Sequence, residues 1–279
     1  MAHTNLIADS GSTKTDWLVV REGAVVRSMY TKGMNPYFQS YEEIQKEIET
    51  VLAPEIKDLS VDAVHFYGAG CVFDKADIMW KAISSCISSE IHIYSDLLAA
   101  AHSTCGHEAG IACIIGTGSN SGFYDGREIK KNISPLGFIL GDEGGGAMLG
   151  RILVSDVLKG ILSKPLQDAF FERFRMTHAD ILDRVYKKPF PNRFLASLSP
   201  FLHEHLNEPE IRQIVINGFN SFLTRNVMQY DYEEYCVNFV GSVAYHYEGI
   251  LRETVEAAGI CVGKIIKNPV EGLIDYYNN

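Results

Sequence analysis

Short apolar runs at the start of the chain predict a β-hairpin. Leu6–Ala8 and Trp17–Val20 flank a turn built almost entirely of Gly, Ser, Thr and Lys, and Asp9 stands where the first run ends. Apolar runs of this length are typical of buried strands, and the small polar residues between them are typical of a tight connection. A third strand over 25–30 and a helix over 41–52, with Pro54 just beyond its end, are predicted to follow.

The same pattern returns after Gly110. Ile111–Ile115 is predicted as a buried strand, 116–121 as a second turn of small residues, and Asp125-Gly126 as a two-residue hairpin turn before a third strand. Each half therefore begins with a strand, a small-residue turn, a strand, a tight turn and a strand. Two unrelated hairpins would give the same local pattern, but an internal repeat constrains the whole fold and predicts two similar lobes, 1–106 and 107–279.

Strands and helices alternate along the rest of the chain. Helical spacing predicts helices over 76–87, from Asp96 onward, and over 147–162, 208–228 and 245–258, with mostly helical sequence over 164–207. Further strands are predicted over 61–67, 91–94, 235–240 and 262–267. This alternation indicates an α/β fold in layers.

Charge and composition exclude several classes of protein. A net charge of -10 argues against a general nucleic-acid binder, which needs a basic face. Apolar runs stay well short of the roughly 20 residues of a membrane span, and a strand pattern begins too early for a signal peptide. The six cysteines are scattered without a C-x-x-C pair, so we expect reduced thiols in a cytoplasmic protein.

The small-residue turns are the best candidates for chemistry. Such a turn points several backbone N–H groups into one concavity, which suits anionic oxygens. Asp9 at its start could hold Mg²⁺, largely through water. The sequence contains neither a complete Walker A loop nor a complete G-x-G-x-x-G fingerprint, which argues against the P-loop and Rossmann classes. An ordinary Ser/Thr-rich hairpin that happens to contain an Asp remains the alternative.

Two turns of this kind, one in each half, resemble the phosphate motifs of the sugar kinase, heat-shock-70 and actin superfamily. Gly-Thr-Gly-Ser-Asn at 116–120, followed by Gly-Asp-Glu-Gly-Gly at 141–145, narrows the resemblance to the N-acetylglucosamine kinases and BadF/BadG-type ATPases. The likeness covers nearly the whole chain. It implies two ribonuclease-H-like lobes, the second with a helical insertion, around a cleft for Mg²⁺-ATP and an amino sugar.

The resemblance also assigns roles to individual residues. Asp96 stands at the position of the catalytic base, where a carboxylate can take a proton from a sugar hydroxyl, although capping of the helix that follows would suit an Asp equally well. The sugar-binding positions are Asn35, Gly137, Asn120 and Asp142. The ATP-binding positions are Asp9, Gly11, Ser12, Thr13, Lys14, Gly116, Thr117, Gly118, Gly241 and Ser242.

Local structure offers a simpler role for several of these residues. Asn35 precedes Pro36 and could serve only to form a turn, Asp142 could cap the helix after it, and Gly241 could mark an ordinary strand-to-helix turn. The resemblance implies phosphorylation of the 6-hydroxyl of an amino sugar, N-acetylglucosamine first, by a homodimer. Glucosamine and N-acetylmuramic acid are alternative substrates. An ATPase that drives electron transfer and a non-catalytic sugar sensor are alternative functions.

Overall fold

The computed structural model describes residues 3–11, 14–72 and 74–278, and these form two compact units. The first comprises Met1–Glu108, Gly126–Glu128 and Pro269–Asn279; the second comprises Ala109–Asp125 and Ile129–Asn268. The division after Glu108 lies close to the one expected from the sequence. The C-terminal segment, by contrast, packs with the first unit and not with the second, because its helix buries Leu273 against that unit.

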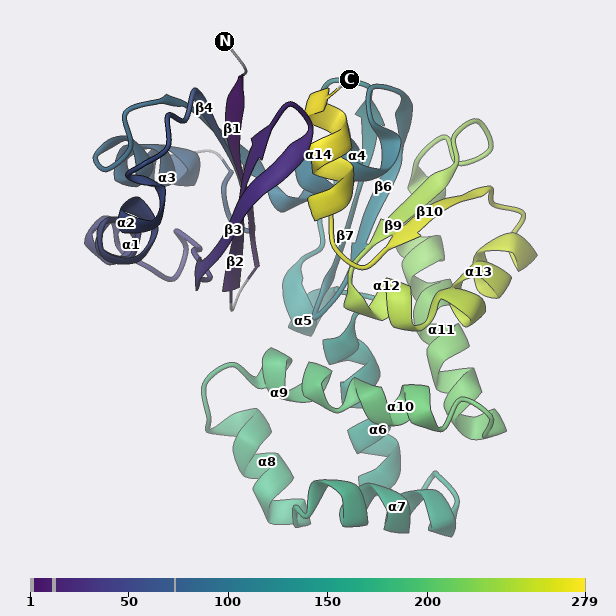
Figure 1. The fold of residues 1–279 in the computed structure, drawn as a ribbon. Helices are drawn as coiled ribbons and strands as arrows, with labels where there is room; N and C mark the ends of the chain where they lie inside the picture. The colour runs from purple at the N-terminus through teal and green to yellow at the C-terminus, as the bar shows by residue number, and fades with distance from the viewer. Residues whose placement is uncertain (1–2, 12–13, 73, 279) are drawn as a thin grey trace. The chain divides into compact units, whose positions relative to one another are not determined.

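The first unit is a five-stranded sheet with helices on both faces (Figure 1). Its strands, in the spatial order β3-β2-β1-β4-β5, are β1 (Thr4–Ser10), β2 (Lys14–Arg21), β3 (Ala24–Lys32), β4 (Ala63–Gly68) and β5 (Glu90–Ser95). The first three form an antiparallel meander, and β4 and β5 run parallel to β1. The carboxyl ends of β1, β4 and β5 therefore meet at one edge.

Alternation along the strands separates two cores in this unit. Leu6 and Trp17 face the core that holds the helices α1 (Tyr41–Glu47) and α3 (Asp74–Ser84), whereas Ile7 faces α4 (Asp96–Cys105) and α14 (Val270–Asn278). The helix expected over 41–52 continues as a wider turn over Ile48–Leu52 and then as α2 (Ala53–Ile56). Pro54 lies inside this helix and not beyond it, because the first turn of α2 does not need the missing N–H.

The second unit repeats this strand order. Its sheet, β10-β9-β6-β7-β8, is built from β6 (Ala109–Ile115), β7 (Ser119–Asp125), β8 (Ile129–Ile133), β9 (Val237–Val240) and β10 (Val262–Ile266). Strands β6, β7 and β8 form the antiparallel meander, and β9 and β10 run parallel to β6. The repeat read from the sequence is thus a repeat of topology, and the α/β fold with two actin-like lobes is confirmed.

A helical insertion between β8 and β9 distinguishes the second unit (Figure 1). It contains α5 (Gly137–Leu140), α6 (Gly146–Leu158), α7 (Lys164–Phe174), α8 (His178–Tyr186), α9 (Pro191–Ser197), α10 (Ser199–Glu204), α11 (Pro209–Arg225) and the short turn Val227–Gln229. The helices α12 (Ser242–His246) and α13 (Glu248–Ala257) connect β9 to β10. None of the helices in the described ranges is long and apolar enough to cross a membrane.

The expectation of reduced thiols is wrong for one pair of cysteines. Cys236 and Cys261 form a disulfide with an S–S distance of 2.13 Å. They precede Val237 and Val262, which are register partners on the adjacent parallel strands β9 and β10. The sheet therefore brings together two residues that are 25 positions apart in the chain. The other four cysteines, 71, 86, 105 and 113, are not in disulfides.

Close packing of α14 on α4 generates a prediction for stability. A Cβ at Gly272 would lie 2.2 Å from the carbonyl oxygen of Ser103, so Gly272→Ala must push the two helices apart. We expect the free energy of unfolding to fall by about 1–3 kcal/mol in urea denaturation. Gly249→Ala, in a helix with open space around it, is the control and should be neutral or stabilising. Equal effects of the two substitutions would contradict this packing.

Candidate active site

Two carboxylates lie at the carboxyl edge of the first unit's parallel strands. Asp9 pairs in register with Tyr67 of β4, which pairs with Tyr94 of β5, and Asp96 lies two residues beyond Tyr94. Both carboxylates therefore lie at the edge where ligands bind in sheets of this kind. Asp96 is also close enough to Asp9 for its negative charge to help raise the pKa of Asp9.

The structure shows which residue is the N-cap of α4, a role for which the sequence left Asp96 as a candidate. Ser95 is the N-cap of α4, and its Oγ accepts a hydrogen bond from the Leu98 N–H at 3.2 Å. Asp96 is the first helical residue, and its Oδ1 accepts from the Leu97 N–H at 2.9 Å. Burial raises the pKa of Asp96, although part of its surface stays accessible. A partly accessible carboxylate in a desolvated position is well suited to accept a proton.

Asp9 combines burial with negative neighbours that the positive charge of Lys14 offsets only in part. Burial, and then the charges of Asp16 and Asp96, raise the pKa of Asp9 from 3.8 to about 7. A divalent cation would relieve this repulsion, so the site suits Mg²⁺ electrostatically. The described residues contain no group of three or more side chains that could chelate a metal by themselves. This fits an ion held by one carboxylate together with phosphate oxygens and water.

The turn between β1 and β2 is fixed by its flanking hydroxyl groups. Ser10 Oγ lies 2.8 Å from Thr15 Oγ1 and accepts a hydrogen bond from the Met34 N–H at 3.0 Å. The Gly11 N–H donates to the Lys14 carbonyl at 3.0 Å, which closes the turn. Neither hydroxyl was singled out from the sequence, although both belong to the Ser/Thr pattern of the motif.

Lys14 is the cation of this turn. Its Nζ lies 2.8 Å from Asp16 Oδ1 and 4.6 Å from the centre of the Tyr30 ring, so the ammonium group is oriented by two side chains of the same unit. The predicted phosphate contacts Ser12 and Thr13 lie outside the described residues.

Asn35 and Asp96 both lie beside the segment that follows β4. Gly70 is so close to Asn35 that a Cβ there would lie 2.6 Å from Asn35 Oδ1. The next residue, Cys71, is buried, and burial together with the charge of Asp96 raises the pKa of its thiol to about 12. Asn35 Oδ1 accepts a hydrogen bond from the Tyr37 N–H at 2.9 Å, which is the local turn that the Asn-Pro sequence indicated.

In the second unit, the turn after β6 and the loop before α6 are joined through their backbones. The Gly146 N–H donates to the Gly116 carbonyl at 2.8 Å, and the Ala147 N–H donates to the Thr117 carbonyl at 2.9 Å. A Cβ on Gly145 would lie 2.7 Å from the carbonyl carbon of Gly118. Gly116 has open space around it, which a side chain would otherwise fill.

Asp142 projects from this loop onto the turn. Its Oδ1 accepts a hydrogen bond from the Ser119 N–H at 3.2 Å, and a Cβ on Gly118 would lie 2.7 Å from its carboxylate. The backbone of Asp142 is left-handed, with φ of 56°. Burial raises the pKa of this carboxyl group. The N-cap of α6 is Gly145, and no side chain makes a capping hydrogen bond there. Asp142 therefore does not cap that helix.

The predicted adenosine motif, Gly241-Ser242, packs closely on the end of β6. Gly241 is the N-cap of α12, and Ser242 is the first residue of that helix. Gly241 has φ of 129°, and a Cβ there would lie 2.3 Å from the Ile115 carbonyl oxygen. The turns that follow β6 and β9 are therefore in contact at the carboxyl ends of two parallel strands.

Asn120 and Gly137 complete the predicted sugar residues of this unit. Asn120 Oδ1 accepts hydrogen bonds from Asn132 Nδ2 and from the Ser121 N–H, both at 2.9 Å. Among the hydrogen bonds of the described residues, none uses the amide nitrogen of Asn120. Gly137 is exposed at the start of the four-residue helix α5, with φ of 74°.

Comparison with known proteins bears on the whole chain. No family model and no curated protein matches it. A candidate N-acetylglucosamine kinase from Porphyromonas gingivalis is 46% identical, with a TM-score of 0.95 over 98% of both chains. The chain belongs to the N-acetylglucosamine kinase family. It is accordingly an ATP-dependent carbohydrate kinase.

Two more distant structures are similar to this chain in fold. A candidate N-acetylglucosamine kinase from Chromobacterium violaceum is 15% identical over 98% of both chains, with a TM-score of 0.73. A candidate N-acetylmannosamine kinase from Listeria monocytogenes is 13% identical over the same share of both chains, with a TM-score of 0.54.

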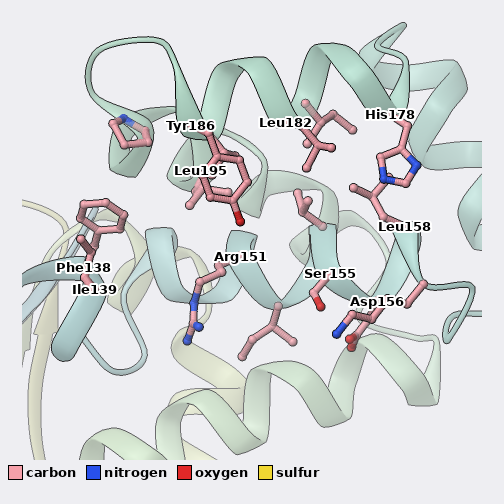
Figure 2. Close-up of a pocket in the computed structure, with 16 residues that line it drawn as sticks. Phe138, Ile139, Arg151, Ser155, Asp156, Leu158, His178, Leu182, Tyr186 and Leu195 are labelled. Carbon is pink, nitrogen blue, oxygen red and sulfur yellow. The ribbon is translucent and has the colours of Figure 1, made fainter.

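A cavity of 920 Å³ in the second unit is separate from these residues (Figure 2). It lies among α5, α6, α8 and α9, and Arg151, Ser155, Tyr186 and Leu195 are among the side chains around it. None of the predicted site residues lines it. The size of this cavity therefore does not identify the predicted active site of the chain.

The pKa of Asp9 generates a prediction of pH dependence. Between about pH 4 and pH 7 the folded state holds a proton on Asp9 that the unfolded chain releases, so this group's contribution to stability decreases as pH rises. Without ligands, Asp9→Asn should therefore be more stable than the wild type at pH 8, by about 2 kcal/mol after allowance for partial exposure.

Thermal unfolding measured from pH 4 to pH 8 tests this expectation. The gain should shrink toward pH 4. Asp168→Asn, which removes one partner of the exposed ion pair with Lys164, is the control and should change stability little. A less stable Asp9→Asn at pH 8 would show that the carboxylate is compensated in the folded protein.

Proposed function

We propose that this chain transfers the γ-phosphoryl group of ATP to the 6-hydroxyl of an amino sugar, and that N-acetylglucosamine is its substrate. One observation carries the proposal. Asp96 begins α4 at the carboxyl end of β5, and Ser95 is the N-cap of that helix, so the Asp96 carboxylate, which accepts from the Leu97 N–H through Oδ1, lies partly accessible at the edge of the sheet. The 46%-identical relative, itself described as a candidate N-acetylglucosamine kinase, supports the choice of sugar.

Asp96 acts as the general base in this mechanism. The sugar hydroxyl oxygen forms a bond to the γ-phosphorus while the bond from that phosphorus to the β,γ-bridging oxygen breaks, and ADP leaves. Asp96 accepts the hydroxyl proton, which prevents a positively charged oxygen from developing. The raised pKa of the Asp96 carboxyl group makes it a stronger proton acceptor than an exposed Asp.

Backbone groups of two turns would bind the phosphates, and one carboxylate would act through a cation. Asp9 would hold Mg²⁺, which when bound neutralises phosphate charge. Gly11, Lys14 and the predicted contacts Ser12 and Thr13 belong to the first phosphate turn. Gly116–Gly118 supply the second, where the open space at Gly116 leaves room for phosphate oxygens. Gly241 and Ser242 follow β9 as the adenosine turn.

The sugar contacts combine donors with acceptors. Asp142 accepts from sugar hydroxyls, and Asn120 donates through the amide nitrogen that its own hydrogen bonds leave over. Asn35 likewise keeps its amide nitrogen for a hydroxyl oxygen, because its Oδ1 is occupied by the Tyr37 N–H. Gly137 stays a proposed contact on resemblance alone. A ring with adjacent hydroxyls suits this mixture of donors and acceptors.

The substrate is tested by ADP release with Mg²⁺-ATP against a panel of N-acetylglucosamine, glucosamine, N-acetylmannosamine and N-acetylmuramic acid. We expect N-acetylglucosamine to give the highest kcat/KM and the product to carry phosphate on O6, as read by ³¹P NMR. A sugar 1-phosphate as product, or another sugar at the top of the panel, would contradict the proposal.

The role of Asp96 is tested by Asp96→Asn. Loss of the base should lower kcat by a factor of about 10²–10⁴, with the sugar Kd from calorimetry changed by less than threefold. Ser95→Ala is the matched control, because it removes the N-cap from the same helix. It should cost about 1 kcal/mol of stability and leave kcat nearly unchanged. The reverse pattern would assign the helix cap, and not the base, as the critical feature.

A further inference from the structure

One short segment supports two of the three predicted sugar residues of the second unit, Asp142 and Asn120. Residues 225–230, which begin at the last residue of α11, contact the neighbour of Asp142 at one end and the neighbour of Asn120 at the other. We call residues 225–230 the support segment. It contains none of the predicted site residues.

The first contact passes through Glu143. Glu143 Oε1 lies 2.6 Å from Arg225 Nε, and Glu143 Oε2 accepts a hydrogen bond of 3.4 Å from Asn226 Nδ2. The Glu143 side chain is 13% exposed and Asn226 is 4% exposed, whereas the Arg225 side chain is 63% exposed. Solvent therefore reaches Arg225, while the Glu143 carboxylate is held in a mostly buried position by two charge-assisted partners.

The adjacent side chains of Asp142 and Glu143 have different interaction partners. Asp142 is bound by the Ser119 N–H, whereas Glu143 is bound by the end of α11. Positive φ angles at Asp142 and Gly144 flank Glu143. A non-glycine residue in the left-handed region costs of order 1 kcal/mol, and it persists only where the surroundings hold it. The interactions of Glu143 with Arg225 and Asn226 help to stabilise this backbone conformation.

The second contact passes through Tyr230. Its Oη donates to the Ser121 carbonyl at 2.9 Å, accepts from the Ile133 N–H at 2.9 Å and lies 2.9 Å from Ser121 Oγ. Tyr230 is buried, so these bonds are made in a position with little water. Ser121 follows Asn120 directly, and its own N–H donates to Asn120 Oδ1. Tyr230 therefore fixes the strand that orients the Asn120 amide.

We propose that Arg225, Asn226 and Tyr230 are positioning residues for the sugar, acting through Glu143 on Asp142 and through Ser121 on Asn120. The inference rests on the proposed function, since it assigns the supported residues to the sugar. None of the three touches the phosphate turn Gly116–Gly118 in the hydrogen bonds of the structure. Their loss should therefore affect the sugar more than ATP.

The test uses Tyr230→Phe and Arg225→Gln in the full-length protein. Each should raise the KM for N-acetylglucosamine by about tenfold while the KM for ATP changes by less than twofold. Glu143→Gln combined with Arg225→Gln should raise the sugar KM no further than either substitution alone, because the two act through one contact. Arg225→Lys should restore part of the affinity.

Matched controls separate positioning from a general loss of stability. Tyr247→Phe removes another buried tyrosine hydroxyl of the same unit, which donates to the Ser199 carbonyl at 2.6 Å. Arg212→Gln removes the ion pair of Arg212 with Glu253 on the same α11 helix. Both controls should leave the sugar KM unchanged. Equal effects on the sugar KM from Tyr247→Phe and Tyr230→Phe would overturn the inference.

Amide hydrogen exchange of the sugar-free protein distinguishes this inference from the proposed function. The amides of 141–147 should exchange faster in Arg225→Gln, and those of 119–122 faster in Tyr230→Phe, than in the two controls. If these amides respond but no sugar stimulates ADP release by the wild type, the proposed function fails while the support of the two loops stands. If the wild type is active and neither the amides nor the sugar KM respond, the positioning role fails.

Discussion

Backbone segments of the second unit approach each other so closely that no side chain fits between them. Gly145 lies on Gly118, and Gly241 lies on the end of β6, at separations that a single Cβ would violate. Backbone hydrogen bonds from Gly146 and Ala147 join the same segments. The predicted phosphate turn, the loop that carries Asp142 and the predicted adenosine turn are therefore packed directly against one another. The placement of Asp142, the proposed sugar contact, depends on this constraint.

The first unit contributes chemistry of a different kind. Two of its predicted site residues are carboxylates: burial raises the pKa of both Asp9 and Asp96, and at Asp9 the negative charges of Asp16 and Asp96 raise it further. Main-chain atoms in one unit can recognise phosphate oxygens without adding charge. The carboxylates in the other can accept a proton or attract a cation.

Much of this arrangement could be predicted from the sequence, because it depends on local pattern. Two copies of strand, turn and strand gave two sheets with corresponding strand orders. What the sequence left undecided depends on small differences or on distant partners. Ser95 and Asp96 are adjacent and both suit an N-cap, so only backbone geometry separates them. Cys236 and Cys261 are joined by strand register, and Glu143 meets Arg225 across a long stretch of chain. Periodicity carries no information on either pair.

The left-handed backbone of Asp142 has a consequence for the sugar contact that we propose for this residue. Its conformational cost is met during folding, when the contacts of Glu143 and Ser119 are formed, so the ligand does not have to order this carboxylate on arrival. Asn120 is oriented in the same way by Ser121 and Asn132. Pre-organisation of both side chains favours affinity by sparing conformational entropy, and it favours discrimination because a fixed acceptor cannot turn to suit a sugar whose hydroxyl points elsewhere.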